Sequence, residues 1–177
     1  KFIEGNMVTM EGVCSGSKHK TIASSIKIGY FEAGITSAVY YPTNLSDDLL
    51  KKIEKANDEY VELAGLNFGL THSEYLVCNN NFCLVETGAR GGGAGISNVI
   101  TPWTSGIDNY DVFYRSLMGE IVDVKSLNPL KRNALLRYYR KEDISEKSAF
   151  KIKELPETAI FCYNFIGTQY IANNQDC

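Results

Sequence analysis

The opening third of the chain carries the hydrophobic and polar pattern of short β-strands. Residues 2–13 bracket a polar Glu-Gly-Asn with apolar side chains, and residues 26–31 and 35–42 are rich in β-branched and aromatic side chains. Such runs, bounded by turn-forming residues, are typical of strands that pair with their sequence neighbours. The pattern therefore predicts short antiparallel strands.

The spacing of apolar residues changes to a helical period after residue 45. Ser46 is placed to cap a helix, and Gly65 is placed to end it. Asp47 and Asp48 suit the positive end of the helix dipole. The apolar positions that fall on one side at helical spacing are Leu49, Leu50, Ile53, Ala56, Tyr60, Leu63 and Ala64. This is the best-defined element that the sequence predicts.

A hairpin pattern and a glycine-rich segment follow this helix. Two β-rich arms in residues 73–86 flank three asparagines, which tolerate the left-handed backbone of a tight turn. Residues 88–95 form a glycine-rich loop, and residues 96–103 begin a helical run that Pro102 is expected to interrupt.

Helical and strand patterns also alternate in the last third of the chain. Residues 109–120 predict a second helix, and residues 131–140 a short third one. The apolar side of the second helix is predicted to consist of Val112, Phe113, Leu117 and Met118. Residues 158–174 look like a closing hairpin around Gly167. Together these elements predict an α+β fold, an antiparallel sheet with helices packed on one face.

Composition and charge narrow the class of protein. The chain has 177 residues, of which 44% are hydrophobic and 22% charged, with a net charge of −3 and no long run of like charges. These values fit a globular domain that binds neither nucleic acid nor membrane. No apolar stretch approaches the roughly 18 to 20 residues that span a bilayer, so we expect a cytoplasmic protein. The chain begins inside a strand-like run without methionine, so we expect a piece of a longer protein.

Cysteine usage is typical of a reducing compartment. The chain has five cysteines with neither CxxC spacing nor clustered histidines, which disfavours a zinc site or a disulfide framework. We expect reduced thiols that pack as small hydrophobic side chains.

Two glutamates in the hairpin are candidate metal ligands. If residues 79–81 form a three-residue loop, Cys78 faces Phe82, and Glu74 lies directly opposite Glu86 on one face. Opposed like charges repel unless a cation lies between them, and Mg²⁺ accepts one or two carboxylates beside water and phosphate oxygens. The alternative is that both glutamates simply reach solvent. A loop of two or four residues would break this register.

The segment after Glu86 adds to the candidate site. Arg90 follows four residues later, and three glycines come directly after it. Arginine offers a fixed fork of donors to phosphate, and glycines let the backbone approach a ligand closely. A carboxylate pair, an arginine and a bare backbone together indicate a phosphoryl-transfer site.

Residues 71–93, THSEYLVCNNNFCLVETGARGGG, resemble the ATP-grasp superfamily. The C-terminal lobe of that family carries a first acidic metal ligand, a hairpin, and a strand that ends in E-x-N-x-R before glycines. The segments IEG at 3–5, HKT at 19–21 and TSGIDNYDVFYRSLMGE at 104–120 are also similar. The resemblance implies an ATP-grasp C-terminal lobe over residues 1–120 and an appended helix and strand-rich tail over 121–177.

The resemblance also implies roles for individual residues. Glu74 corresponds to the first magnesium ligand, and Glu86 to the ligand that bridges the metals. Arg90 corresponds to the arginine that contacts the transferred phosphate or the acyl-phosphate oxyanion, and Lys20 to a basic residue near the phosphates of ATP. The family's usual asparagine falls on Gly88, which has no side-chain oxygen to hold a second metal.

Two further residues border the predicted site. His72 lies two residues before Glu74, so strand alternation puts both on one face. Its role is either a substrate contact or that of a structural histidine. Glu4 belongs to the strand that family members run beside the active site.

By this resemblance the parent protein would be an ATP-dependent C–N ligase. It would use ATP and Mg²⁺ or Mn²⁺ to activate a small carboxylate as an acyl phosphate, then pass the acyl group to an amine or a similar nucleophile. The N-terminal lobes that hold the nucleotide would lie outside this chain, so the chain alone is expected to be inactive. The resemblance also allows a homodimer. Two alternatives are a non-catalytic module that binds a cation or a partner, and a purely structural domain.

Overall fold

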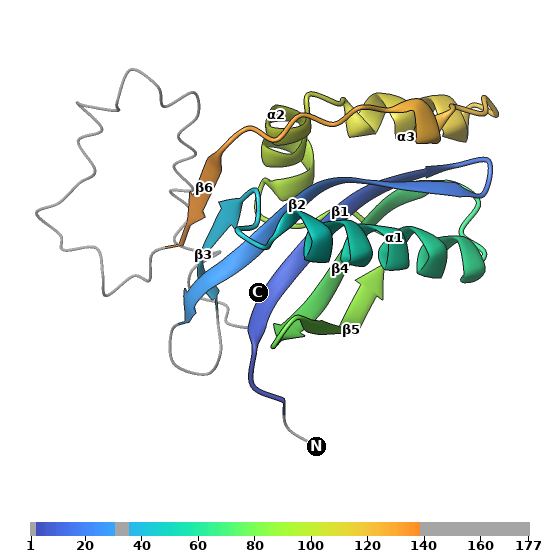
Figure 1. Ribbon diagram of the computed structural model, residues 1–177. Coiled ribbons are helices and arrows are strands. Elements are labelled where there is room, and N and C mark those ends of the chain that lie inside the picture. Colours follow the sequence, from blue (N-terminus) through green and yellow to red (C-terminus); the bar gives the residue numbers. More distant parts are fainter. Residues whose placement is uncertain (1–2, 31–35, 139–177) are drawn as a thin grey trace, which may run out of the picture. The chain divides into compact units, whose positions relative to one another are not determined.

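The computed structural model describes residues 3–30 and 36–138, and its main feature is a six-stranded sheet (Figure 1). The order of strands across the sheet is β5-β4-β1-β2-β3-β6, and every neighbouring pair is antiparallel. The strands are β1 (Asn6–Ser15), β2 (Lys18–Tyr30), β3 (Thr36–Tyr41), β4 (Gly69–Cys78), β5 (Asn81–Gly88) and β6 (Ala134–Arg137).

One long helix and several short ones accompany the sheet (Figure 1). They are α1 (Asp47–Leu63), the π-helix η2 (Ile96–Ile100), α2 (Thr101–Ser105), α3 (Asn109–Leu117) and the 3-10 helix η3 (Val124–Ser126). The predicted α+β fold with an antiparallel sheet is thus confirmed. None of the helices in the described ranges is long and apolar enough to cross a membrane.

Both faces of the central strand β1 are covered, because every residue from Val8 to Ser15 is buried. Alternate side chains of a strand point to opposite faces, and two core clusters follow this alternation. The first joins β1 to α1 and contains Val8, Met10, Ile26, Leu49, Leu50, Ile53, Tyr75 and Val77. The second joins β1 to α3 and contains Val13, Ile22, Leu70, Val112, Val122 and Val124. The long helix therefore covers one face as predicted, whereas α3 packs on the other.

Helix α1 begins and ends where the sequence predicts. The Ser46 side chain accepts a hydrogen bond from the Leu49 backbone N–H at 3.4 Å, and Gly65 follows the last turn with a φ of 80°. The predicted apolar side is right only in the first half, since Tyr60 and Leu63 are exposed. The buried stripe instead continues through Asn57 and Val61.

A polar residue sits in that stripe because the sheet supplies its partners. Asn57 donates to the Thr21 hydroxyl at 2.9 Å and accepts from the Tyr75 hydroxyl at 3.2 Å. A buried amide is tolerated when it is hydrogen-bonded in this way, so the hydrophobic pattern alone misplaces the face of the helix.

A buried histidine network, here called the closed network, ties α1 to the sheet. His19 lies between Asp58 on α1, 2.8 Å from its Nδ1, and the Thr71 hydroxyl, 2.7 Å from its Nε2. Asp58 also accepts hydrogen bonds from Thr21 and lies 3.5 Å from Lys125 Nζ. Burial raises the pKa of Asp58, but the hydrogen bonds from His19 and Thr21 outweigh it and lower the pKa.

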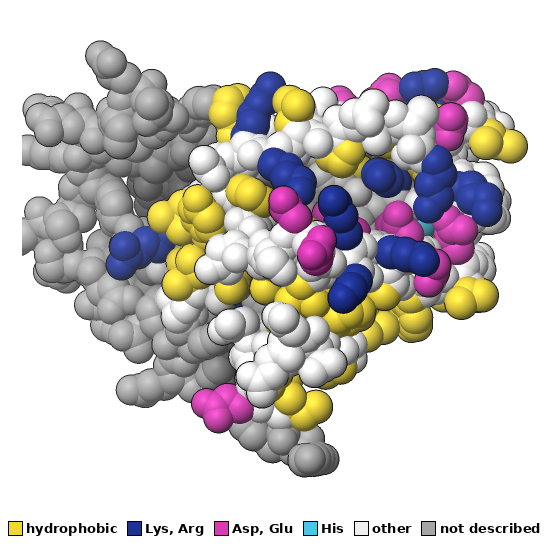
Figure 2. Space-filling model, viewed as in Figure 1, with side chains coloured by type: hydrophobic (Ala, Val, Ile, Leu, Met, Phe, Trp, Pro, Cys, Tyr) yellow, Lys and Arg dark blue, Asp and Glu magenta, His cyan; other side chains and the backbone are white. Residues whose placement is uncertain are grey.

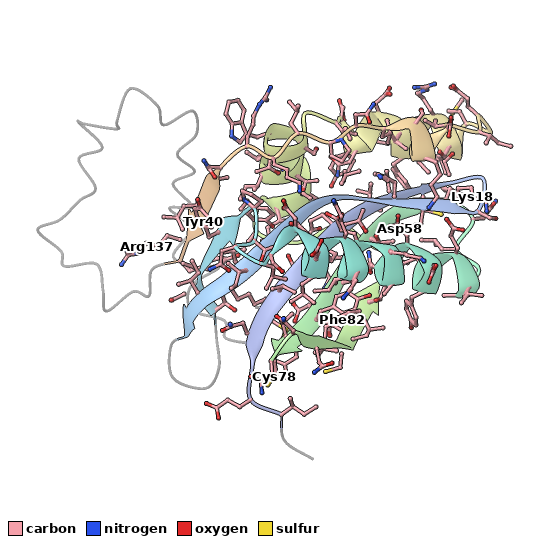
Figure 3. All side chains as sticks on the ribbon, viewed as in Figure 1. Lys18, Tyr40, Asp58, Cys78, Phe82 and Arg137 are labelled. Atoms are coloured by element: carbon pink, nitrogen blue, oxygen red, sulfur yellow. The ribbon has the colours of Figure 1, made fainter. Side chains whose placement is uncertain are left out.

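The closed network extends to the surface of α1 through two lysines. Lys125 lies 2.9 Å and Lys18 3.4 Å from the Glu62 carboxylate. In Figure 3, Lys18 and Asp58 lie toward the same end of the molecule, and Figure 2 shows basic and acidic side chains interspersed over this surface. The network therefore joins α1, the β1–β2 hairpin and η3.

Three later predictions need correction. Residues 131–140 are predicted as a helix, but residues 134–137 form β6, because the open edge of β3 offers hydrogen-bond partners that a short helix cannot match. Pro102 does not interrupt a helix, since it lies in the first turn of α2, where its missing N–H costs nothing. Leu117 and Met118 are exposed, whereas Asn109, Val112 and Ser116 are the buried residues of α3.

The compact unit that contains the sheet runs from Lys1 to Arg137. Residues 121–137, assigned to the tail from the sequence, thus include η3 and β6 and belong to this unit. The predicted closing hairpin of residues 158–174 lies outside the described residues.

Candidate functional site

The β4–β5 hairpin has a shorter turn than the sequence suggests. Cys78 pairs with Asn81, so the turn consists of Asn79 and Asn80, whose φ angles of 47° and 61° are left-handed. This is the backbone of a tight two-residue hairpin turn, which asparagine tolerates. The predicted three-residue loop, with Cys78 facing Phe82, is therefore wrong.

The two glutamates are nevertheless directly opposed. The register shifts between Tyr75, which pairs with Leu84, and Glu74, which pairs with Glu86, so Val85 is an extra residue on β5. A β-bulge of this kind changes the side chains that the following residues present to each face. Without it, Glu86 would face Ser73 on the other side of the sheet. The predicted pairing of the two carboxylates is confirmed, but the bulge rather than the turn produces it.

Glu74 is held on one oxygen by two cationic groups. Lys27 Nζ donates to Oε1 at 2.5 Å, and His72 Nε2 lies 3.4 Å from the same atom. The hydrogen bond from His72 lowers the pKa of Glu74 most, and with Lys27 it outweighs the effect of burial and brings the pKa to about 2. Within the described ranges, Oε2 has no hydrogen-bond partner. Glu74 is thus ionised with one oxygen available.

His72 links Glu74 to a third carboxylate. Its Nδ1 lies 2.6 Å from Glu11 Oε1, and Glu11 is only 2% exposed. Burial on its own would lower the pKa of His72, but the hydrogen bonds to Glu11 and Glu74 outweigh burial and raise the pKa to about 9. A positively charged imidazolium, which donates from both ring nitrogens, fits between two carboxylates. We call Glu11, His72, Glu74 and Lys27 the open network.

Glu86 and Arg90 are more exposed than the open network. Their side chains are each 58% exposed, and Arg90 Nη2 lies 4.0 Å from Glu86 Oε1. A Cβ atom at Gly88 would lie 3.1 Å from Cγ of Arg90, so the arginine side chain folds over the glycine. Arg90 therefore occupies the space beside position 88, where the resemblance would place a metal-binding asparagine.

The glycine-rich loop packs closely on the sheet. A Cβ atom at Gly91 would lie 2.4 Å from Cβ of Ser97 and one at Gly92 would lie 3.1 Å from Glu11 Oε1. Side chains at these positions would push the loop away from the open network. The bare backbone therefore lies directly against the residues that support Glu74.

Not every predicted site residue lies in this group. Lys20 is half-buried and pairs with Val13 of β1. Glu74 pairs with Thr9, which lies four residues before Val13 on the same strand. Glu4 is exposed and precedes β1. The lysine that contacts Glu74 is Lys27.

Sequence reasoning missed Lys27 and Glu11. Glu11 is the one charged residue of β1, and a charged residue within a buried strand is a signal of a polar site on one face. Lys27 follows two other lysines on β2 and gives no such signal. The partners of Glu11 and Lys27 are also distant in sequence. Because β4 pairs with β1, Glu11 contacts His72, which follows it by 61 residues. A single-chain pattern does not reveal that pairing.

The carboxylate pair fits one hard divalent cation. Glu74 and Glu86 supply oxygen donors from neighbouring strands, as Mg²⁺ prefers, and leave the other coordination positions to water and phosphate. The described residues contain no group of three or more His, Cys, Asp or Glu side chains that would enclose a metal. Any cation here would therefore take its remaining ligands from water or from a bound phosphate.

No protein-family model matches the sequence, and no curated protein matches it. The structure, by contrast, is similar to solved ligases. An L-amino acid ligase from Bacillus licheniformis aligns with a TM-score of 0.63 and 22% identity, over 76% of this chain and 35% of that one. A phosphoribosylglycinamide synthetase from Anaerococcus prevotii gives a TM-score of 0.68 and 17% identity, over 79% and 36%.

A carboxylase gives a similar result. Biotin carboxylase from Campylobacter jejuni, solved as a β-γ-ATP complex, aligns with a TM-score of 0.67 and 14% identity, over 76% of this chain and 30% of that one. The chain thus spans about a third of the length of each of these three proteins. The resemblance to ATP-grasp ligases is confirmed at the level of the fold, which the compact unit of this chain shares with them.

Proposed function

We propose that this chain is the metal- and phosphate-binding lobe of an ATP-dependent, magnesium-dependent ligase. The parent protein would activate a small carboxylate as an acyl phosphate and transfer the acyl group to an amine or a similar nucleophile. The shared fold supports this class of enzyme. The observation that carries the proposal is the direct opposition of Glu74 and Glu86 beside Arg90.

Each of these residues has a role that its environment supports. Glu74 would offer Oε2, because Oε1 is already held by Lys27 and His72. Glu86 would complete the carboxylate pair from β5, and Arg90 would bind the transferred phosphoryl group through its planar fork of donors. A bound Mg²⁺ would neutralise negative charge on the phosphates.

The space around Gly88 favours one cation over two. Glycine supplies no donor atom, and the Arg90 side chain fills the adjacent space, 3.1 Å from where a Cβ atom would lie. The guanidinium would then provide positive charge where a second metal would otherwise act. We therefore propose a single magnesium ion with Arg90 beside it.

The nucleotide would be held jointly with lobes outside this chain. The biotin carboxylase that shares the fold was solved with β-γ-ATP and is about three times as long as the aligned segment. We propose that Lys20 contributes to phosphate binding from β2, at a greater distance from the carboxylates than Lys27. This chain alone would bind ATP poorly and would not turn over.

The proposal is tested by Glu86→Gln in the full-length parent. Removing one of two opposed like charges does not destabilise the fold, so the melting temperature is expected to stay the same or rise slightly. ATP-dependent ligation should fall to nearly zero. Glu59→Gln, which alters an exposed glutamate on α1, is the matched control and should leave the rate unchanged. Full ligation by Glu86→Gln would contradict the role of Glu86 as a metal ligand, and a lower melting temperature together with full ligation would make it a structural residue.

One observation favours a second candidate, a non-catalytic module that binds a cation or a partner. The charges of Glu11 and Glu74 are balanced by His72 and Lys27, so the open network is neutral without a metal, which favours the partner-binding form of this module over the cation-binding form. In that case the full-length parent would lack ATP-dependent acyl transfer. Measuring ADP release with a panel of carboxylates and amines separates the two candidates.

A further inference from the structure

We propose that Glu11 is a positioning residue that acts through His72 to fix the orientation of the Glu74 carboxylate. By this mechanism Oε1 of Glu74 accepts hydrogen bonds from the protein, and Oε2 coordinates the cation. The inference rests on the proposed function, because it assumes that Glu74 is a metal ligand. It concerns Glu11 and His72, neither of which would touch the cation.

Glu11 is placed to act indirectly. It lies on β1, directly across from His72 on β4, and it is 2% exposed. The backbone of the glycine-rich loop closes over it, since a Cβ atom at Gly92 would lie 3.1 Å from its Oε1. A ligand on the surface of the site cannot reach a carboxylate sealed in this way.

His72 transmits the position of Glu11 to Glu74. Its Nδ1 lies 2.6 Å from Glu11 Oε1, and its Nε2 lies 3.4 Å from Glu74 Oε1. His72 is 6% exposed and pairs across the sheet with Gly88, which has no side chain to displace the ring. With one ring nitrogen held by a buried carboxylate, the other is aimed at a single oxygen of Glu74.

The arrangement is not needed to hold the sheet together. A buried ion pair contributes little to stability compared with well-packed apolar residues of the same size. Residues at the corresponding level of the other face pack as hydrophobic core, as Met10 and Tyr75 do. The role that remains for the Glu11–His72 pair is therefore to orient Glu74, the proposed metal ligand. Outer partners of metal ligands typically change metal affinity by about 10- to 100-fold.

The experiment uses the 177-residue chain with Mn²⁺ as the probe, whose binding is followed by electron paramagnetic resonance. Glu11→Gln is expected to weaken Mn²⁺ binding about tenfold or more, because the amide no longer anchors His72 as a charged acceptor. Asp58→Asn is the matched control, since it alters a carboxylate that also accepts from a buried histidine, but in the closed network. It should leave Mn²⁺ affinity unchanged.

A second variant separates positioning from stability. Glu11→Leu/His72→Leu removes both partners together, so no buried charge is left unpaired. Its melting temperature should match or exceed that of the wild type, while its Mn²⁺ affinity should fall at least as far as that of Glu11→Gln. A double variant that is stable and binds Mn²⁺ like the wild type would overturn the inference.

Glu74→Gln distinguishes the failure of this inference from failure of the proposed function. If Glu74→Gln loses Mn²⁺ binding but Glu11→Gln does not, Glu74 is a ligand and Glu11 has no positioning role. If Glu11→Gln and Asp58→Asn weaken binding equally, the effect is one of general stability, and the inference fails. If the wild type does not bind Mn²⁺, or Glu74→Gln binds it equally well, the metal site itself is wrong.

Discussion

The two histidines of this chain occupy buried networks on opposite faces of the same sheet, and the two networks end differently. In the closed network, His19 contacts Asp58 and Thr71, and Asp58 in turn accepts hydrogen bonds from Thr21. In the open network, His72 contacts Glu11 and then Glu74. In the first, both carboxylate oxygens of Asp58 have partners in the protein, whereas the second ends on a carboxylate oxygen with no partner among the residues described.

Under the proposed function, this difference gives His19 a structural role and His72 a positioning role. Composition does not distinguish the networks, since each has a histidine beside a carboxylate and a lysine. What differs is whether every polar atom is satisfied by the fold. A carboxylate with a spare oxygen, opposed to a second carboxylate, is the point at which a ligand would complete the network.

The largest effect on stability is expected in the closed network, for Asp58→Ala. The substitution leaves His19 and the Thr21 backbone N–H without their acceptor. Leaving a buried donor without its acceptor costs about 1 to 3 kcal/mol for each group. Urea unfolding of the 177-residue chain measures this loss. A loss below about 1 kcal/mol would show that the closed network does not hold α1 to the sheet, and the distinction between the networks would fail.

The next effect concerns Arg90, which lies beside the open network. The substitution Arg90→Lys changes the geometry of the hydrogen-bond donors but keeps the positive charge. Lysine offers a point charge in place of a planar fork, so turnover by the full-length parent should fall about 100-fold, or about 2.7 kcal/mol in activation free energy. The apparent affinity for ATP should change much less, because the contact strengthens as charge develops. Steady-state rates at saturating substrates measure both. Equal turnover numbers would make Arg90 a surface residue.

The smallest effect is the acid dependence of the closed network. A hydrogen bond from Lys125 and one from the His19 backbone bring the pKa of Glu62 to about 2. A carboxyl whose pKa is lower in the folded state stabilises the protein above its unfolded pKa of roughly 4.3, and this contribution disappears as the pH falls toward 2. Glu62→Gln should therefore remove on the order of 1 kcal/mol or less at pH 6, and nothing near pH 2. A difference that persists at pH 2 would contradict the assignment.

Local patterns predicted much of this fold because their causes are local. The capped start of α1, most of β1, the end of β2, β3 and the β4–β5 hairpin were predicted from residues near one another in sequence, whereas residues 18–25 of β2 were not. The failures occurred where a distant partner decides the outcome. Asn57 is buried only because Thr21 and Tyr75 satisfy it, and residues 134–137 form a strand only because β3 has a free edge.

In the candidate site, too, contacts set by local spacing were predicted and contacts set by distant partners were missed. Strand alternation places His72 on the face of Glu74, and their contact confirms it. Lys27 reaches Glu74 diagonally across β1, because the residue of β2 in register with Glu74 through Thr9 is Ser25, two positions before Lys27. No spacing along the chain indicates that approach. The roles of Glu74, Glu86, Arg90 and Lys20 in catalysis stay predictions.

The extra residue Val85 has a consequence beyond the glutamates. Strand β5 is at the outer edge of the described sheet, and such an edge can recruit strands from other molecules. A bulge bends the strand and interrupts its row of free hydrogen-bonding groups. Deleting Val85 would still leave Glu86 opposite Glu74, now in a regular hairpin. The edge strand would then be straighter and would offer an uninterrupted row of hydrogen-bonding groups to other strands. An edge interrupted by the bulge is a poorer template for a strand of another molecule.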